Sequence, residues 1–252
     1  MTLLSGFHDI SLFQFALVAA VAFIASLIGG VSGYGTGALM PLVLVPMVGA
    51  EPVVPIIAIS ALLTNTSRAT AFINFIDRKR ALIVLACAIP TCVLGAWAYT
   101  HLTGRGASLV IGSMLIASVP LRRVLKTRGI VCSDRALALG SVGYGLLVGG
   151  TTGSGVILLS LLMAAGVAGA GVIATDAAIS IVIGLVKVAV FGFSGVLTGQ
   201  VVAFALLIGI TAFPGAFLAK ALVVRMPIHV HTAVLDAVVL IGGIFLVARV
   251  VR

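Results

Sequence analysis

Charged side chains are the scarcest feature of this 252-residue chain. They make up 8% of the residues, with six Asp and Glu in total, whereas hydrophobic residues make up 62%. A soluble globular domain carries about 25% charged residues, so the composition excludes that class. The mean hydropathy of +1.34 and apolar runs that recur from residue 11 to residue 248 predict a polytopic membrane protein.

Cysteine and histidine are also few, which leaves little room for metal or catalytic chemistry. The three cysteines, Cys87, Cys92 and Cys132, have no metal-binding spacing. The four histidines lie at segment ends or in loops, so a serine nucleophile in the apolar segments would have no histidine base. We therefore expect no metal, no cofactor and no enzymatic activity.

Basic residues outnumber acidic ones and give the chain a net charge of +9. Membrane proteins carry such an excess in their cytoplasmic loops, so the pattern predicts a lipid bilayer, and no nucleic acid, as the partner. Placing the two basic loops on the cytoplasmic side of the cell (inner) membrane puts the N-terminus outside. Eight of the fifteen basic residues lie in these loops: Arg78, Lys79 and Arg80, then Arg122, Arg123, Lys126, Arg128 and Arg135.

Glycine is abundant, and its densest stretch occurs twice. Gly29–Gly37 separates two apolar runs, and Gly149–Gly155 does the same later in the chain. A shift of 120 positions aligns the two stretches without a gap, which indicates a duplicated unit. The shift also aligns Gly49 with Gly169, Ser60 with Ser180, Gly95 with Gly215 and Arg105 with Arg225.

The apolar pattern predicts an all-α protein with five segments in each half. An odd number of segments per half inverts the second half relative to the first, so we expect two inverted repeats, 1–121 and 136–252, joined by a basic cytoplasmic connector, 122–135. One segment in each half is too short to cross a hydrocarbon core about 30 Å thick. The expected segments are 11–28, 38–48 (short), 52–76, 81–100 and 107–121, then 136–148, 156–167 (short), 171–193, 200–222 and 230–248.

A few charged residues interrupt these segments. A charge at the membrane centre costs about 2.5–3.5 kcal/mol, so each is a candidate for function, except Lys220, which can extend its ammonium to the interface. Arg68 shares one helical face with Ser60, Thr64 and Ser67, while Asp176, Ser180 and Lys187 form a similar stripe in the second half. Asp176 and Lys187 are roughly 16 Å apart along a helix, so any partners lie on other helices. Asp236 interrupts the last segment.

The glycine stretches and these charges together predict an anion site. A helix that starts inside the membrane presents unpaired N–H groups and partial positive charge, and inverted halves would bring two such ends to one midplane site. Close helix packing through Gly-xxx-Gly spacing is the alternative reading. The candidate binding residues are Ser32, Gly33, Gly35, Thr36, Gly37, Ser60, Thr64, Asn65, Arg68, Thr152, Gly153, Ser154, Gly155, Ser180 and Lys187; Asp176 is the candidate for proton coupling.

The first glycine stretch resembles a motif of the TauE/SafE sulfite-exporter family. Gly33-Tyr34-Gly35-Thr36-Gly37 followed by Pro41 is similar to that family's Gly-x-Gly-Gly-Gly and proline, and Gly153-Ser154-Gly155 is a weaker match. Thr36 departs from the motif's middle glycine, and no proline stands at Leu161 in the second copy. The resemblance implies export of sulfur-containing anions such as sulfite or organosulfonates, with proton coupling.

The sequence therefore predicts a secondary transporter for a small anion, working by alternating access of one repeat against the other. A passive anion channel and a non-transporting membrane scaffold remain as alternatives. Whether the chain assembles as a homo-oligomer is left open.

Overall fold

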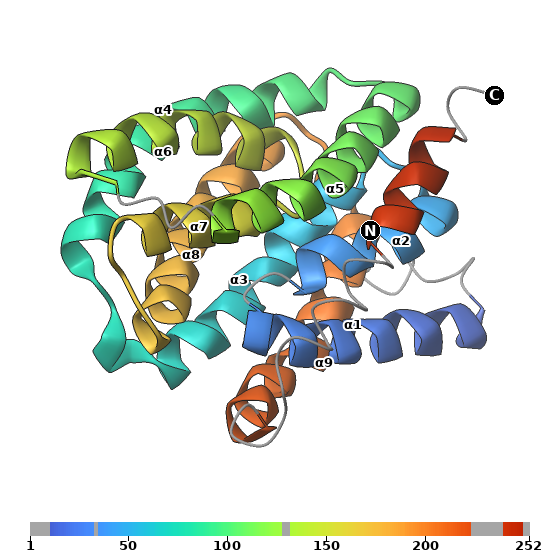
Figure 1. Ribbon diagram of the computed structural model, residues 1–252. Coiled ribbons are helices and arrows are strands. Elements are labelled where there is room, and N and C mark those ends of the chain that lie inside the picture. Colours follow the sequence, from blue (N-terminus) through green and yellow to red (C-terminus); the bar gives the residue numbers. More distant parts are fainter. Residues whose placement is uncertain (1–10, 33–34, 128–131, 223–238, 249–252) are drawn as a thin grey trace.

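A computed structural model describes residues 11–32, 35–127, 132–222 and 239–248. Every regular element among them is helical, which confirms the all-α prediction (Figure 1). The elements in chain order are α1 (Leu12–Ser32), α2 (Gly35–Val48), α3 (Val53–Ala71), the 3₁₀ turn η2 (Ile73–Phe75), α4 (Arg78–Thr100), α5 (Gly104–Thr127), α6 (Asp134–Gly150), α7 (Gly155–Ala164), α8 (Ala170–Phe193), α9 (Gly199–Leu222) and the helix Val239–Ala248.

Four stretches among the described residues are long and apolar enough to cross a membrane: Val53–Ala71, Arg78–Thr100, Gly104–Leu121 and Ala170–Phe193. Shorter apolar helices accompany them, including α2 and α7, the two segments that the sequence predicts to be short. The fold is thus that of a multi-pass membrane protein. The first glycine break is narrower than expected, because α1 continues through Gly29 and Gly30 to Ser32.

The closest helix packing joins the two halves of the chain. α4 lies along α6, and α1 lies along α9, so each pair combines one helix from each half (Figure 1). Glycines let α4 and α6 approach closely: a Cβ atom on Gly149 would lie 2.3 Å from the carbonyl oxygen of Cys92, and one on Gly145 would lie 2.3 Å from that of Ala88. Such small-residue contacts are typical of membrane helix pairs.

The helix contacts keep their pattern when the two halves are exchanged. The 120-residue shift makes α1 equivalent to α6, α3 to α8, and α4 to α9. The contact of α1 with α9 then corresponds to that of α6 with α4, and the contact of α3 with α9 to that of α8 with α4; all four are observed. The equivalent helices α3 and α8 run antiparallel, because Ala58 lies beside Gly184 while Arg68 meets Asp176. Inverted halves would produce this arrangement; the assignment of two inverted repeats remains a prediction.

The connecting segments gather at two ends of the molecule. At one end, the Tyr99 hydroxyl donates a 2.7 Å hydrogen bond to the carbonyl of Ala50. At the other, the start of α4 meets the start of α6 through a 2.6 Å ion pair between Lys79 and Asp134. The 23 residues of α4 separate these ends by roughly 35 Å, about the thickness of a hydrocarbon core with its margins.

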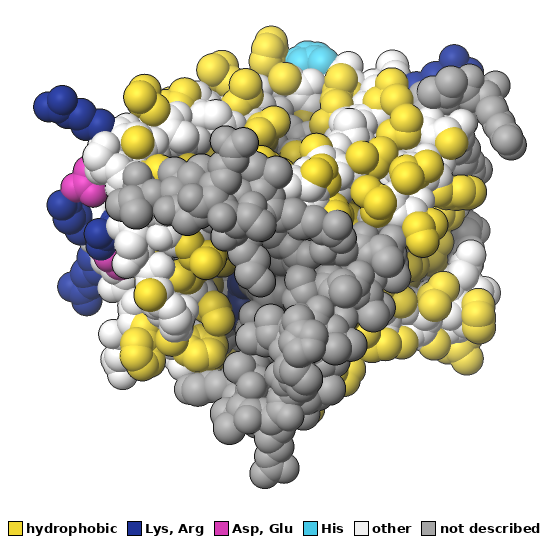
Figure 2. All heavy atoms as spheres, in the orientation of Figure 1, with side chains coloured by type: hydrophobic (Ala, Val, Ile, Leu, Met, Phe, Trp, Pro, Cys, Tyr) yellow, Lys and Arg dark blue, Asp and Glu magenta, His cyan; other side chains and the backbone are white. Residues whose placement is uncertain are grey.

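The visible surface is largely apolar, as a lipid-facing surface must be (Figure 2). Lys and Arg side chains gather at one edge of the face shown, with Asp and Glu side chains among them. The exposed Arg78, Lys79, Asp134 and Arg135 belong to the end where α4 and α6 begin. The residues expected in loops lie at helix ends instead: Arg78, Lys79 and Arg80 in the first turn of α4, and Arg135 in that of α6. Helix α5 continues to Thr127 and so takes in Arg122, Arg123 and Lys126, which makes the connector shorter than the expected 122–135.

Candidate functional site

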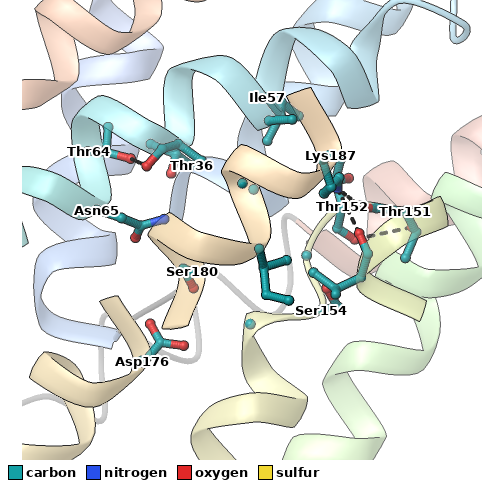
Figure 3. Close-up of a pocket in the computed structure, with 18 of the residues that line it drawn as sticks. Thr36, Ile57, Thr64, Asn65, Thr151, Thr152, Ser154, Asp176, Ser180 and Lys187 are labelled. Carbon is teal, nitrogen blue, oxygen red and sulfur yellow. Dashed lines mark hydrogen bonds between the residues drawn. The ribbon is translucent and has the colours of Figure 1, made fainter. Parts of the chain in front are cut away.

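A cavity of about 110 Å³ lies where α3, α6 and α8 meet the first turns of α2 and α7 (Figure 3). Its polar lining comes from helix faces and from the segment between α6 and α7, and its apolar lining from one side of α3 and α8. The lining residues are Thr36, Gly37, Ile57, Ala58, Ala61, Thr64, Asn65, Arg68, Tyr144, Val148, Thr151, Thr152, Gly153, Ser154, Gly155, Asp176, Ser180, Ile183, Gly184 and Lys187.

α3 contributes one face of the helix to the cavity, apolar in its first half and polar in its last two turns. Thr64 and Arg68 of the predicted helical face line it together, and so does Asn65, whereas Ser67 of the same face does not. Arg68 is buried and donates hydrogen bonds to the side-chain oxygen of Asn65 and to Asp176. Ser60, one turn before Thr64, is buried but does not line the cavity, and its hydroxyl donates back to the carbonyl of Ile57.

Asp176 near the start of α8 supplies the negative charge of the site. Its Oδ2 atom lies 3.1 Å from Nη2 of Arg68, which places the partner on another helix, as predicted. Only 1% of Asp176 is exposed, and an ion pair so deeply buried needs further hydrogen bonds to offset desolvation. Its second oxygen, Oδ1, has no hydrogen-bond partner among the described residues, so the carboxylate retains an unused acceptor facing the interior.

Lys187 lies three turns further along α8 and points to the end of α6. Its ammonium donates to the carbonyl of Val148 at 2.7 Å and to that of Thr151 at 3.1 Å. The last carbonyls of a helix have no partner within the helix and carry partial negative charge, so a lysine there is favourable. An ammonium has three N–H groups, and the two described bonds leave one for a ligand in the cavity that Lys187 lines.

The two glycine breaks meet at this cavity. Thr36 and Gly37 in the first turn of α2 line it, and so do Ser154 and Gly155 at the start of α7. A Cβ atom on Gly37 would lie 3.3 Å from the amide nitrogen of Gly153. The φ angle of Gly153 is +79°, a conformation that L-residues with side chains rarely adopt. The glycines therefore allow two helix N-termini to approach the same space.

The segment between α6 and α7 adds hydroxyl groups. Thr152 is buried and lines the cavity, and its Oγ1 atom has no hydrogen-bond partner among the described residues (Figure 3). Ser154 is also buried, and it precedes α7 without capping it through its side chain. A buried hydroxyl without a partner costs free energy, and a ligand in the cavity would remove that cost.

The alternative reading, in which glycine serves only packing, holds for part of the second stretch. Gly145 and Gly149 pack against α4, whereas Gly153 and Gly155 line the cavity. The earlier glycines therefore serve helix packing, and the later ones line the cavity.

Most of the predicted residues lie together, with a few exceptions. Gly35 is the first residue of α2 and does not line the cavity. Gly33, Asp236 and the side chains of Ser32 and Lys220 lie outside the described residues. Sequence reasoning missed Tyr144 and Thr151: the 120-residue shift aligns them with the apolar Ile24 and Val31, which give no functional signal. The predicted residues that line the cavity are Thr36, Gly37, Thr64, Asn65, Arg68, Thr152, Gly153, Ser154, Gly155, Asp176, Ser180 and Lys187.

The fold and the site together define a multi-pass membrane protein with a small, buried, charged cavity between its helices. The family model of the sulfite exporter TauE/SafE matches residues 18–246, so the chain belongs to that family. Its members are membrane transporters rather than enzymes, and the chain is therefore a transporter. No curated protein and no solved structure matches the chain.

Proposed function

We propose that the protein is a secondary transporter for a small sulfur-containing anion, such as sulfite or a short organosulfonate, in the cell (inner) membrane with its N-terminus outside. The observation that carries the proposal is one cavity shared by Arg68, Lys187 and the first turns of α2 and α7. Helix N-termini with cationic side chains form anion sites. The family membership supports the same substrate class.

Cavity size supports a small substrate. Pockets for drug-sized ligands measure about 300–1,000 Å³, whereas this one measures about 110 Å³. Arg68 would bind the anion through its planar N–H groups. Lys187, three turns from Asp176 along α8, would attract the anion elsewhere in the same cavity through its remaining N–H, where the hydroxyls of Thr152 and Ser154 with nearby amides add further donors. Ser32, Gly33 and Gly35 remain candidates beside the first break.

Alternating access remains part of the proposal, with a change in the moving units. Close contacts join α4 to α6 and α1 to α9. Two buried hydrophobic cores also mix the halves: one contains Val18, Phe204 and Leu246, the other Val84, Tyr144 and Leu162. We propose that each moving unit combines helices of both halves, with the cavity between them, instead of one repeat moving against the other.

The test is flux of radiolabelled sulfite and of methanesulfonate in proteoliposomes. Hydrogen bonds to charged groups contribute about 1.5–3 kcal/mol each, so Arg68→Gln or Lys187→Gln should lower kcat/KM roughly 10- to 150-fold. Lys79→Gln is the matched control, because Lys79 is exposed and lies outside the cavity. Thermal unfolding in detergent checks that each variant is folded.

Arg68→Gln leaves Asp176 as an unpaired buried charge, which is destabilising. The double variant Arg68→Gln/Asp176→Asn removes both charges of the pair, and it should fold while remaining unable to transport. Wild-type flux from folded Arg68 and Lys187 variants would reject the proposed site. No flux from the wild-type protein with either probe would favour the scaffold alternative, and single-channel conductance in planar bilayers would favour a channel.

A further inference from the structure

The ion pair between Arg68 and Asp176 occupies the place where an anion would bind. Both side chains line the cavity, and Arg68 already donates to the carboxylate oxygen Oδ2 of Asp176. A substrate anion and this carboxylate are chemically equivalent acceptors for the guanidinium. Two anions close to one guanidinium in a buried site repel each other, so the substrate binds Arg68 more readily once Asp176 has lost its negative charge.

We propose that the anion replaces Asp176 at Arg68 while Asp176 takes up one proton, so that one proton and one anion cross the membrane together. This inference rests on the proposed function and adds its coupling. The charges balance: Arg⁺ paired with Asp⁻, plus one anion and one proton, becomes Arg⁺ paired with the anion beside a neutral carboxylic acid. The proton comes from water on the side where the anion enters and leaves with the anion.

The surroundings of Asp176 favour this exchange. Its Oδ1 atom is buried and has no hydrogen-bond partner among the described residues, so an acceptor site for the proton is already present inside the cavity. The net charge of Arg68, Asp176 and Lys187 is +1 in their usual ionised forms. Binding a monoanion with a proton leaves that buried charge unchanged, which avoids the cost of moving a net charge through the membrane.

Among the described residues, few other titratable groups face Asp176. Tyr144 on α6 is within electrostatic range of both Asp176 and Cys92 on α4. Arg68 lies on α3, and Lys187 is three turns away on α8. α7 carries no titratable side chain, and at the start of α4 the backbone of Asp77 contacts the neighbouring Thr175. Asp176 is thus the carboxylate that directly contacts Arg68, a cationic side chain that lines the cavity.

Symport has a consequence for direction. Protonation of Asp176 promotes anion binding, whereas an antiporter needs the proton to oppose it. Anion and proton therefore cross the membrane in the same direction. Protons that leave an acidic compartment down their gradient carry the anion out with them. Export from a cell then requires an anion gradient that exceeds the opposing proton gradient.

The experiment measures methanesulfonate and proton movement together in proteoliposomes. Methanesulfonate stays a monoanion across pH 5–8, so its own ionisation does not contribute. Where the wild-type protein carries only sulfite, sulfite is used near pH 5, where it is mainly the monoanion hydrogensulfite, with the flux of protein-free liposomes subtracted. A trapped pH-sensitive dye reports the protons. For the wild-type protein we expect one proton per anion and a flux that a valinomycin-imposed potential changes less than twofold.

Asp176→Asn should separate the two fluxes. Arg68 then has a permanently neutral neighbour, so anion flux down its gradient continues, proton flux falls at least tenfold, and the anion flux becomes sensitive to the imposed potential. Asp77→Asn is the matched control, since Asp77 also pairs with an arginine but lies outside the cavity; it should behave as wild type.

The outcomes separate the two proposals. Anion flux without protons from the wild-type protein, or proton coupling that survives in Asp176→Asn, overturns the inference and leaves the proposed function intact. If Asp176→Asn does not fold, the wild-type proton-to-anion ratio and its insensitivity to potential still decide. No anion flux from the wild-type protein overturns the proposed function itself.

Discussion

Asp77 shows how a single residue at the membrane boundary fixes the start of a helix. Its side chain accepts a 3.0 Å hydrogen bond from the backbone N–H of Arg80 and pairs with the guanidinium of the same residue. That N–H is the main cause of a lowered pKa for the Asp77 carboxyl, relative to an ordinary value of 3.8. Asp77 is thus the N-cap of α4, at the end of the molecule where the basic residues gather.

Removing this cap should destabilise the protein. We expect Asp77→Ala to lower the free energy of unfolding by about 0.5–2 kcal/mol, because an N-cap side chain is lost. Asp77→Asn keeps a capping oxygen and loses only the partly exposed ion pair, which is worth about 1 kcal/mol or less. Thermal unfolding in detergent compares the three proteins, and equal stability of Asp77→Ala and wild type would contradict the capping role.

The pH dependence of the same comparison has a definite sign. A lowered pKa in the folded state means that ionised Asp77 stabilises the fold above its unfolded pKa and stops doing so as the pH falls through the folded value. The stability difference between wild type and Asp77→Asn should therefore shrink below pH 3.8. A difference that grows toward acid would contradict the assignment.

The charged residues of the candidate site could be singled out from the sequence because charge is so rare in this chain. Arg68, Asp176 and Lys187 interrupt apolar segments, where charge is costly, and all three line one cavity. The direct pairing of Arg68 with Asp176 could not be predicted, because sequence spacing relates residues on one helix and not on two. Tyr144 was missed because a tyrosine within an apolar helix carries no such cost.

At the scale of elements, the pair of α4 and α6 depends on glycine more than any other described contact of the second half. Gly149 has no room for a methyl group, since its Cβ would lie 2.3 Å from the carbonyl oxygen of Cys92 and 2.7 Å from the nitrogen of Ala96. Both are backbone atoms, so relief requires the helices to separate. Gly143 on the same helix has nothing within 4 Å of the equivalent position.

The two glycines should therefore respond to alanine with opposite signs. Gly149→Ala should cost about 1–3 kcal/mol by overpacking, whereas Gly143→Ala should gain up to about 1 kcal/mol, because alanine is the better helix former. Thermal unfolding of the purified proteins measures both. A similar effect of the two substitutions would mean that α4 and α6 do not pack as closely as the structure indicates.

Helix boundaries are predicted best where prolines or breaks in the apolar pattern mark them. The prolines of α2 and the short apolar runs of both α2 and α7 indicate short helices, and the structure has them. The first break was predicted too wide, because Gly29 and Gly30 lower helix propensity without preventing a helix that neighbours support; α1 therefore extends to Ser32. Propensity acts locally, while packing against α9 acts on the whole helix.

At the scale of the whole molecule, the pairing of halves is the feature that sequence alone could not supply. The repeat predicts two units, but contacts of α1 with α9 and of α4 with α6 interleave them. A 120-residue shift identifies equivalent helices and says nothing about which unit each one packs against. The sidedness of the loops, in contrast, follows from the number of segments between them.

Cysteine labelling can test that sidedness. Ala50 meets Tyr99 at one end, and Lys79 meets Asp134 at the other, so the exposed Thr103 and Arg135 should face opposite compartments. With the three native cysteines replaced by alanine, Thr103→Cys in intact cells should react with a membrane-impermeant maleimide. Arg135→Cys should react only after permeabilisation, because the basic connector is retained inside. Reaction of both from outside would contradict a spanning α4, and the reverse pattern would place the N-terminus inside while leaving the cavity and its charges unaltered.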